Sequence, residues 1–222
     1  MPLSDSNSTE NLIEDMIKEL ERRGLAPEML ARAKEILSDE ESLEKIREAT
    51  KIDKDKMEKA TDIKNKIDSL TNEIVSLRYR VNEASKIMGK RLFKDNSETA
   101  RISHKLKERQ VIDQDTLHLF IDDLHKYLVQ SANWDLLYKN ERVKPTLQII
   151  TLYRNFFDHI YDMKGGGSGS DNAYKNLGKI NEGLLGHKVI KIEEYPYLQI
   201  RILEKVKEML EILGENIEDW LR

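Results

Sequence analysis

The sequence contains no cysteine, only four prolines among 222 residues, and no apolar run that approaches the roughly 20 residues needed to span a bilayer. The absence of cysteine excludes disulfides, thiol nucleophiles and cysteine-ligated zinc, and it permits a reducing compartment. Residues 1–10 are polar and acidic, which is not the pattern of a signal peptide. We therefore expect an intracellular protein, cytoplasmic or nuclear, without a membrane span.

Aromatic residues are scarce (6%), whereas charged residues make up 35% of the chain and hydrophobic residues 39%. This composition favours long amphipathic helices with charged outer faces over a turn-rich sheet protein. Apolar residues recur at steps of three and four along much of the chain, so we expect an all-α helical bundle. The stretch 188–193, Lys-Val-Ile-Lys-Ile-Glu, lies between Gly186 and Pro196 and leaves room for one short β segment.

The clearest pattern is a heptad repeat over residues 60–88. Its apolar positions predict one coiled-coil-like helix over about residues 54–93 that packs on a partner helix. Flanking residues such as Lys66 and Arg78 are mostly basic, which favours an acidic partner over a second copy. Residues 193–222 offer such a partner, with eight acidic and four basic side chains. We expect four residues to carry this seam: Ile67, Leu70, Ile74 and Leu77.

Residues 165–170 read Gly-Gly-Gly-Ser-Gly-Ser and hold four of the ten glycines. Such a block is typical of a flexible designed linker, so we interpret it as engineered. Either it shortens a loop of one protein, or it fuses residues 171–222 to their binding partner. The expected organisation is a small helical unit at 1–52, a long helix and bundle at 53–164, the linker, and a C-terminal helical segment that packs on 53–164.

Aromatic side chains concentrate in the second half of the chain. Phe156 and Phe157 are adjacent and cannot both face one core, so the segment 171–222 should cover one of them. Surplus aromatic surface also suits an interface, here a groove that receives the helix expected at 196–213. The candidate protein-interface residues are therefore the four seam residues together with Phe156, Phe157, Tyr197 and Trp220.

Basic residues cluster between Lys86 and Arg109, where eight stand against three acidic residues in a chain of net charge −4. Such a cluster can neutralise phosphates, which suggests an alternative function as a nucleic-acid-associated subunit of replication or transcription machinery. The aromatic residues that stack on single strands are absent there except Phe93, so a solvated face is the competing interpretation. The nucleic-acid candidates are Lys90, Arg91, Arg101, Lys105 and Lys107.

Patterns for catalysis or metal binding are weak. His118, Asp122 and His125 share one helix face and are acceptable metal ligands, as a metal-dependent hydrolase would need. That face borders an apolar stripe, where His and Asp are common without any metal. No nucleophile elbow, Walker loop or dinucleotide fingerprint occurs. We expect no enzyme, no catalytic or metal-ligating residue and no cofactor.

Together these features favour a non-catalytic helical adaptor or assembly subunit of a multiprotein complex that acts through helix–helix packing. Its partner is a protein, and residues 171–222 are themselves a candidate fragment of that partner. Nucleic acid is the alternative partner.

Overall fold

The computed structural model describes residues 17–19, 21–22, 24, 26–38, 40–137, 140–162, 169–215 and 217–218, most of them with their side chains. The chain divides into two compact units, Met1–Ala60 and Thr61–Arg222. Every regular element of the described part is a helix, which confirms the all-α prediction. No helix in these ranges is both long enough and apolar enough to cross a membrane.

The first unit contains α2 (Pro27–Ser38) and the beginning of α3 (Glu40–Ile87). Gly24 precedes α2 with a φ of 71°, a left-handed conformation that favours glycine. The sequence predicts a long helix only from about residue 54, but α3 is a single helix of 48 residues. Residues 40–60 contain neither glycine nor proline, so nothing in them interrupts the helix. The predicted end near 93 is also too late, because Gly89 takes a φ of 72° two residues after the helix ends.

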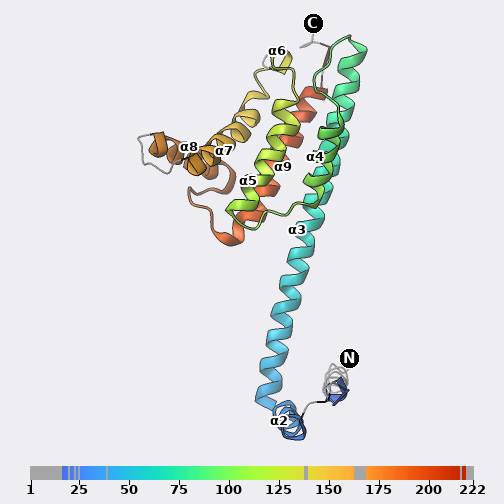
Figure 1. Ribbon diagram of the computed structural model, residues 1–222, viewed down its shortest axis with the longest axis vertical. Coiled ribbons are helices and arrows are strands. Elements are labelled where there is room, and N and C mark those ends of the chain that lie inside the picture. Colours follow the sequence, from blue (N-terminus) through green and yellow to red (C-terminus); the bar gives the residue numbers. More distant parts are fainter. Residues whose placement is uncertain are drawn as a thin grey trace, which may run out of the picture. The chain divides into compact units, whose positions relative to one another are not determined.

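The second unit is a bundle in which α5 packs against α4 and α7, and α7 packs against α8 and α9 (Figure 1). Side-chain caps set the first turns of two of these helices: Asn96 accepts from the Thr99 N–H of α4, and Asp113 accepts from the Thr116 N–H of α5. The elements of this unit after α3 are α4 (Ser97–Glu108), α5 (Gln114–His125), the π-helix η1 (Lys126–Gln130), α6 (Trp134–Leu137), α7 (Lys144–Asp162), α8 (Gly169–Leu185), the 3-10 helix η2 (Ile192–Glu194) and α9 (Tyr195–Gly214).

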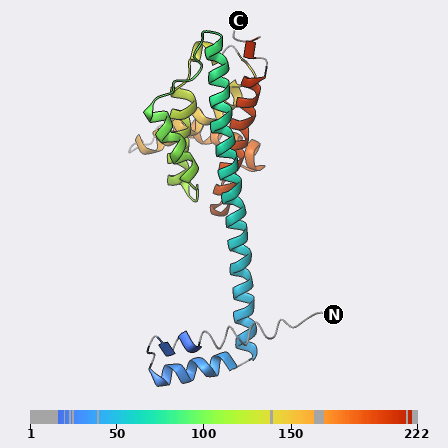
Figure 2. The ribbon, with the colours of Figure 1, turned by 90° about the vertical axis from the view of Figure 1, so that its right-hand side faces the viewer.

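The C-terminal half of α3 lies alongside α9 (Figures 1 and 2). Ion pairs join the two helices: the Lys66 ammonium lies 3.9 Å from Glu204, and the Lys207 ammonium lies 2.7 Å from Glu73. In the first pair α3 supplies the lysine, and in the second pair α9 supplies it. The helix α9 is therefore not simply an acidic partner for a basic α3. The knobs-into-holes geometry of a coiled coil stays a prediction.

Residues of the C-terminal segment pack on elements that precede the Gly/Ser block. The Phe156 ring meets Tyr174 of α8 edge to face with centroids 5.0 Å apart, so the segment covers one of the two adjacent phenylalanines as predicted. Gln199 of α9 is fully buried; its amide accepts from the Val111 N–H at 2.9 Å and donates to the Arg109 carbonyl at 2.8 Å. The Gly/Ser block lies outside the described residues except for its last two, which begin α8.

The prediction of a short β segment at 188–193 was wrong. This stretch is a loop that leads into η2, and no strand occurs in the described ranges. A carboxylate oxygen of Glu194 accepts from the Lys191 N–H at 2.8 Å and turns the chain, which prevents an extended run. The isolated antiparallel bridge of the described part lies elsewhere, between Phe93 and Ala132.

Candidate functional site

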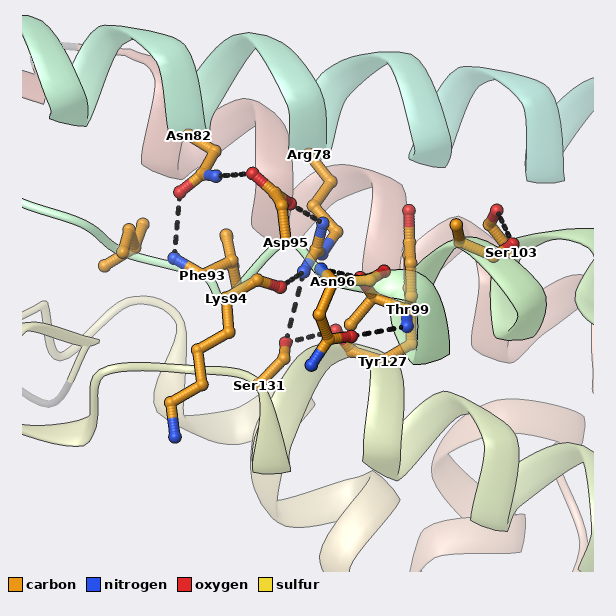
Figure 3. Close-up of polar contacts among 12 residues, drawn as sticks. Arg78, Asn82, Phe93, Lys94, Asp95, Asn96, Thr99, Ser103, Tyr127 and Ser131 are labelled. Carbon is orange, nitrogen blue, oxygen red and sulfur yellow. Dashed lines mark hydrogen bonds and ion pairs between the residues drawn. The ribbon is translucent and has the colours of Figure 1, made fainter.

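A polar network surrounds Arg78, where the loop after α3 meets the end of η1 (Figure 3). The side chain of Arg78 is almost fully buried, and its guanidinium donates to an Asp95 carboxylate oxygen and to the Lys94 carbonyl, both at 2.9 Å. It also donates to the Ser131 hydroxyl at 3.3 Å, and that hydroxyl donates to the Tyr127 carbonyl at 2.5 Å. One long side chain thereby ties α3, the following loop and η1 together.

Two further polar residues of α3 extend this network along the helix. The Asn82 side chain donates to Asp95 and accepts from the Phe93 N–H at 3.0 Å. The Ser85 hydroxyl accepts from the Leu92 N–H at 3.3 Å. These contacts satisfy buried backbone groups of the loop, which would otherwise destabilise the fold.

The network is also balanced in charge. The Arg78 guanidinium lies between two rings, 4.9 Å from the Phe93 centroid and 4.4 Å from that of Tyr127. Burial raises the pKa of the Asp95 carboxyl, but hydrogen bonds and charges from Arg78 and Lys86 outweigh burial and leave that pKa below its ordinary value. A network with this degree of internal pairing stabilises the fold and leaves little to offer a ligand.

The five nucleic-acid candidates divide between a loop and a helix. Lys90 and Arg91 lie in the loop after α3, whereas Arg101, Lys105 and Lys107 belong to α4. None of the five forms an ion pair within the described part of the chain. Successive residues of a helix are about 100° apart, so Arg101 and Lys105 share one side of α4 while Lys107 lies toward another.

The two ends of the basic cluster are engaged inside the protein. The Lys86 ammonium lies 2.6 Å from Glu83 and 3.5 Å from Asp95. The Arg109 guanidinium lies 2.9 Å from Asp123, a buried carboxylate of α5. These two cations therefore contribute less to any phosphate-binding surface than their position in the sequence suggests.

A groove of about 710 Å³ opens between α5, α7, α8 and the loop before α9. Its apolar lining includes Leu117 of α5 and the adjacent Phe156 and Phe157 of α7. Two of its lining residues are apolar yet largely open to solvent: Tyr174 of α8 is 56% exposed, and Val189 of the loop is 76% exposed. Exposed apolar side chains beside a concave apolar surface are typical of a binding site.

A buried polar pair supports the same groove. The Tyr153 hydroxyl donates to the side-chain oxygen Oδ1 of Asn181, and the side-chain nitrogen Nδ2 of Asn181 donates to the backbone carbonyl of Lys188 at 2.9 Å. Burial raises the pKa of the Tyr153 phenol, so the hydroxyl stays protonated as a donor. This chain of contacts fastens the loop that carries Val189 to α7 and α8.

The same loop is closed on itself by His187. Its Nδ1 lies 2.8 Å from the Val189 carbonyl oxygen, and its Nε2 lies 2.8 Å from the Glu194 carboxylate. The backbone hydrogen bond from Lys191, followed by the contact with His187, lowers the pKa of the Glu194 carboxyl and keeps it ionised. Both ends of the groove-lining loop are therefore held by specific contacts.

The predicted interface residues occupy several different environments. Ile67, Leu70 and Ile74 are buried in the core and Leu77 is partly buried, so this seam packs within the chain. Tyr197 is half exposed on α9 and does not line the groove, and Trp220 lies outside the described residues. Phe156 and Phe157, both buried, are the predicted interface residues that the structure brings together at the groove.

The helix expected at 196–213 corresponds to α9, which packs on α5 and α7 within the bundle. Residues 196–213 lie apart from the groove described above, because α9 buries its apolar face in the core instead. The amphipathic helix thus completes the bundle, and none of residues 196–213 lines the groove in the described part of the chain.

The polar residues considered as metal ligands are engaged with protein groups. The His118 ring lies 5.0 Å from the Phe157 ring, and Asp122 lies 2.6 Å from the Lys126 ammonium. Burial lowers the pKa of His125, and the positive charge of Arg154 adds to this effect. Within the described ranges, no group of three or more His, Cys, Asp or Glu side chains is arranged to hold a metal ion.

Sequence reasoning missed the lysines of the groove. Lys175 and Lys179 of α8 and Lys188 of the loop line it, and no acidic side chain is among the lining residues that the structure describes. The spacing of Lys175 and Lys179 by four residues was visible in the sequence, but Gly178 and Gly183 weaken the helical pattern of this stretch, although α8 runs through both. The approach of Lys188 depends on the folded loop.

Comparison with known protein families, with curated protein sequences and with solved structures finds no match to this chain.

Proposed function

We propose that this protein is a non-catalytic helical adaptor or assembly subunit that binds another protein through the groove between α5, α7 and α8. The observation that carries the proposal is the combination of a 710 Å³ apolar groove with exposed apolar side chains on its walls. Burying such surface against a partner contributes a favourable free energy of roughly 25 cal/mol per Å² of apolar area removed from water.

A protein partner is supported over a small ligand by apolar surface that continues outside the groove. Ile192 of η2 is 78% exposed and follows Val189 by three residues along the same loop. Tyr197, near the start of α9, adds further exposed aromatic surface. A partner that covered this segment would bury more apolar area than a ligand confined to the groove.

Site-specific photo-crosslinking of the full chain tests this proposal. A photoreactive phenylalanine analogue replaces Val189 at the groove or, as control, Ile87, which is 88% exposed at the end of α3. We expect discrete, saturable protein adducts from position 189 in extracts of cells that express the protein, and none of these from position 87. Identical adducts from both positions, or none from position 189, would contradict the proposal.

A second candidate function is nucleic-acid binding through Lys90, Arg91, Arg101, Lys105 and Lys107. The observation that favours it is that these five cations have no ion pair in the described part of the chain. A fluorescence-anisotropy titration with a labelled oligonucleotide at two salt concentrations separates the candidates. Binding that collapses with salt supports it, and no binding at low salt removes it.

A further inference from the structure

The charge of the groove identifies the kind of protein segment that it fits. Lys175, Lys179 and Lys188 line it, no acidic side chain is among the lining residues that the structure describes, and none of the three has an ion pair in these ranges. We propose that the groove binds an acidic amphipathic helix of a partner protein, an inference that rests on the proposed function. Its apolar face would enter the groove while its carboxylates meet the three lysines.

The three lysines are gathered on one side of the groove by the local structure. Lys175 and Lys179 are four residues apart on α8, so they lie on the same face of that helix. The aliphatic part of the Lys188 side chain packs against α8 at Gly178, where the helix has no side chain. A Cβ built at Gly178 would lie only 3.5 Å from the Lys188 Cβ. This arrangement places three positive charges beside one apolar surface, in a chain whose net charge is −4.

The backbone of the groove favours a helix over an extended peptide. An extended peptide gains affinity by adding to an exposed strand edge, and the described part of the chain contains no strand. The helical walls α5, α7 and α8 instead use their backbone groups internally. A partner must therefore bind through side chains, and an amphipathic helix presents them along one face at positions i, i+3, i+4 and i+7.

Two designed peptides supply the probes. Both are helical and carry the same leucine face, but the polar face of one is glutamate and that of the other is lysine. Fluorescence anisotropy of each labelled peptide is measured against the full chain at low and moderate salt. We expect the acidic peptide to bind, to weaken as salt rises, and to bind better than the basic peptide.

Charge reversal tests the role of the lysines directly. The triple variant K175E/K179E/K188E should weaken the acidic peptide about tenfold or more and improve the basic one, because three attractive charge pairs become three repulsive ones. The matched control R101E/K105E/K107E makes the same change of charge on α4 and should leave both affinities within about twofold of the wild type. An equal loss in both variants would show that only the overall charge matters and would overturn the inference.

A third variant separates this inference from the proposed function. Val189→Asp places a charge on the exposed apolar wall and should weaken both peptides, whereas Ile87→Asp should weaken neither. If both peptides bind equally and both need Val189, the groove is a protein site and the acidic partner is wrong. If neither peptide binds, or if Val189→Asp changes nothing, the proposed function fails together with the inference.

Discussion

The arginine network and the groove are both built at junctions between helices, but they treat charge in opposite ways. The Arg78 guanidinium is buried, stacked between two rings and bonded to Asp95, Lys94 and Ser131. The groove leaves Lys175, Lys179 and Lys188 without ion pairs in the described ranges. A charge that is paired and buried within the chain supports the fold, whereas unpaired charges beside exposed apolar surface are available to a partner.

The largest expected effect comes from breaking the network. Arg78→Leu removes the guanidinium and leaves the Lys94 carbonyl and the Asp95 carboxylate without their main donor. Loss of one partner of a buried pair costs about 3–5 kcal/mol, and because the Asp95 side chain is 39% exposed we expect a value near 2–3 kcal/mol. Urea unfolding followed by tryptophan fluorescence reports on this unit, which contains both tryptophans.

The matched control for that variant is Arg80→Leu. Arg80 is exposed on the same helix and has no ion pair in the described part, so its replacement should change the free energy of unfolding by less than about 0.5 kcal/mol. Equal destabilisation by the two replacements would contradict the structural role assigned to Arg78.

An intermediate effect is expected at the base of the groove. Tyr153→Phe deletes the hydroxyl that donates to Asn181 and leaves a buried amide oxygen without that donor. We expect a loss of about 1–2 kcal/mol in the same urea experiment and faster amide exchange in the loop near Lys188. Tyr79→Phe is the control, since Tyr79 is 63% exposed, and a loss of the same size there would show that the Asn181 contact is not the cause.

The smallest expected effect on stability belongs to the groove lysines. Replacing Lys175, Lys179 and Lys188 together by glutamine should change the free energy of unfolding by less than about 1 kcal/mol, because these side chains have no ion pair to lose within the described part of the chain. A large destabilisation would place them with Arg78 as supports of the fold.

Much of the fold could be predicted from the sequence because the spacing of apolar residues indicates helices and the faces that they bury. Ile67, Leu70 and Ile74 repeat at steps of three and four, and all three are buried. Buried polar residues are harder to recognise in the sequence: Thr71, Arg78 and Ser85 recur every seven residues beside this seam and are buried as well. Their heptad spacing was visible, but the hydrogen-bond partners of Arg78 and Ser85 outside α3 come from the loop after α3 and from Ser131, and the Thr71 hydroxyl has no partner in the described part of the chain.

The candidate site was predicted less well than the fold. Phe156 and Phe157 are adjacent on one helix, so their side chains point in different directions and cannot both face the same core. This correctly indicated that a second element covers one of them, which is α8 through Tyr174. The sequence also predicted that the final helix packs on the preceding helices, where α9 contacts α5 and α7, but it did not distinguish that position from the separate groove beside α8. The choice between these two positions depends on which surfaces meet in three dimensions, which local spacing does not determine.

The most direct test of the proposed function is to map where the acidic peptide binds. Amide chemical shifts of the full, isotope-labelled chain are recorded as the peptide is added. We expect saturable changes at residues 174–179 and 188–190, which line the groove, and none at residues 92–96 of the arginine network. Changes confined to the basic residues of α4, or an absence of saturable change at the groove, would contradict the assignment of this surface as the binding site.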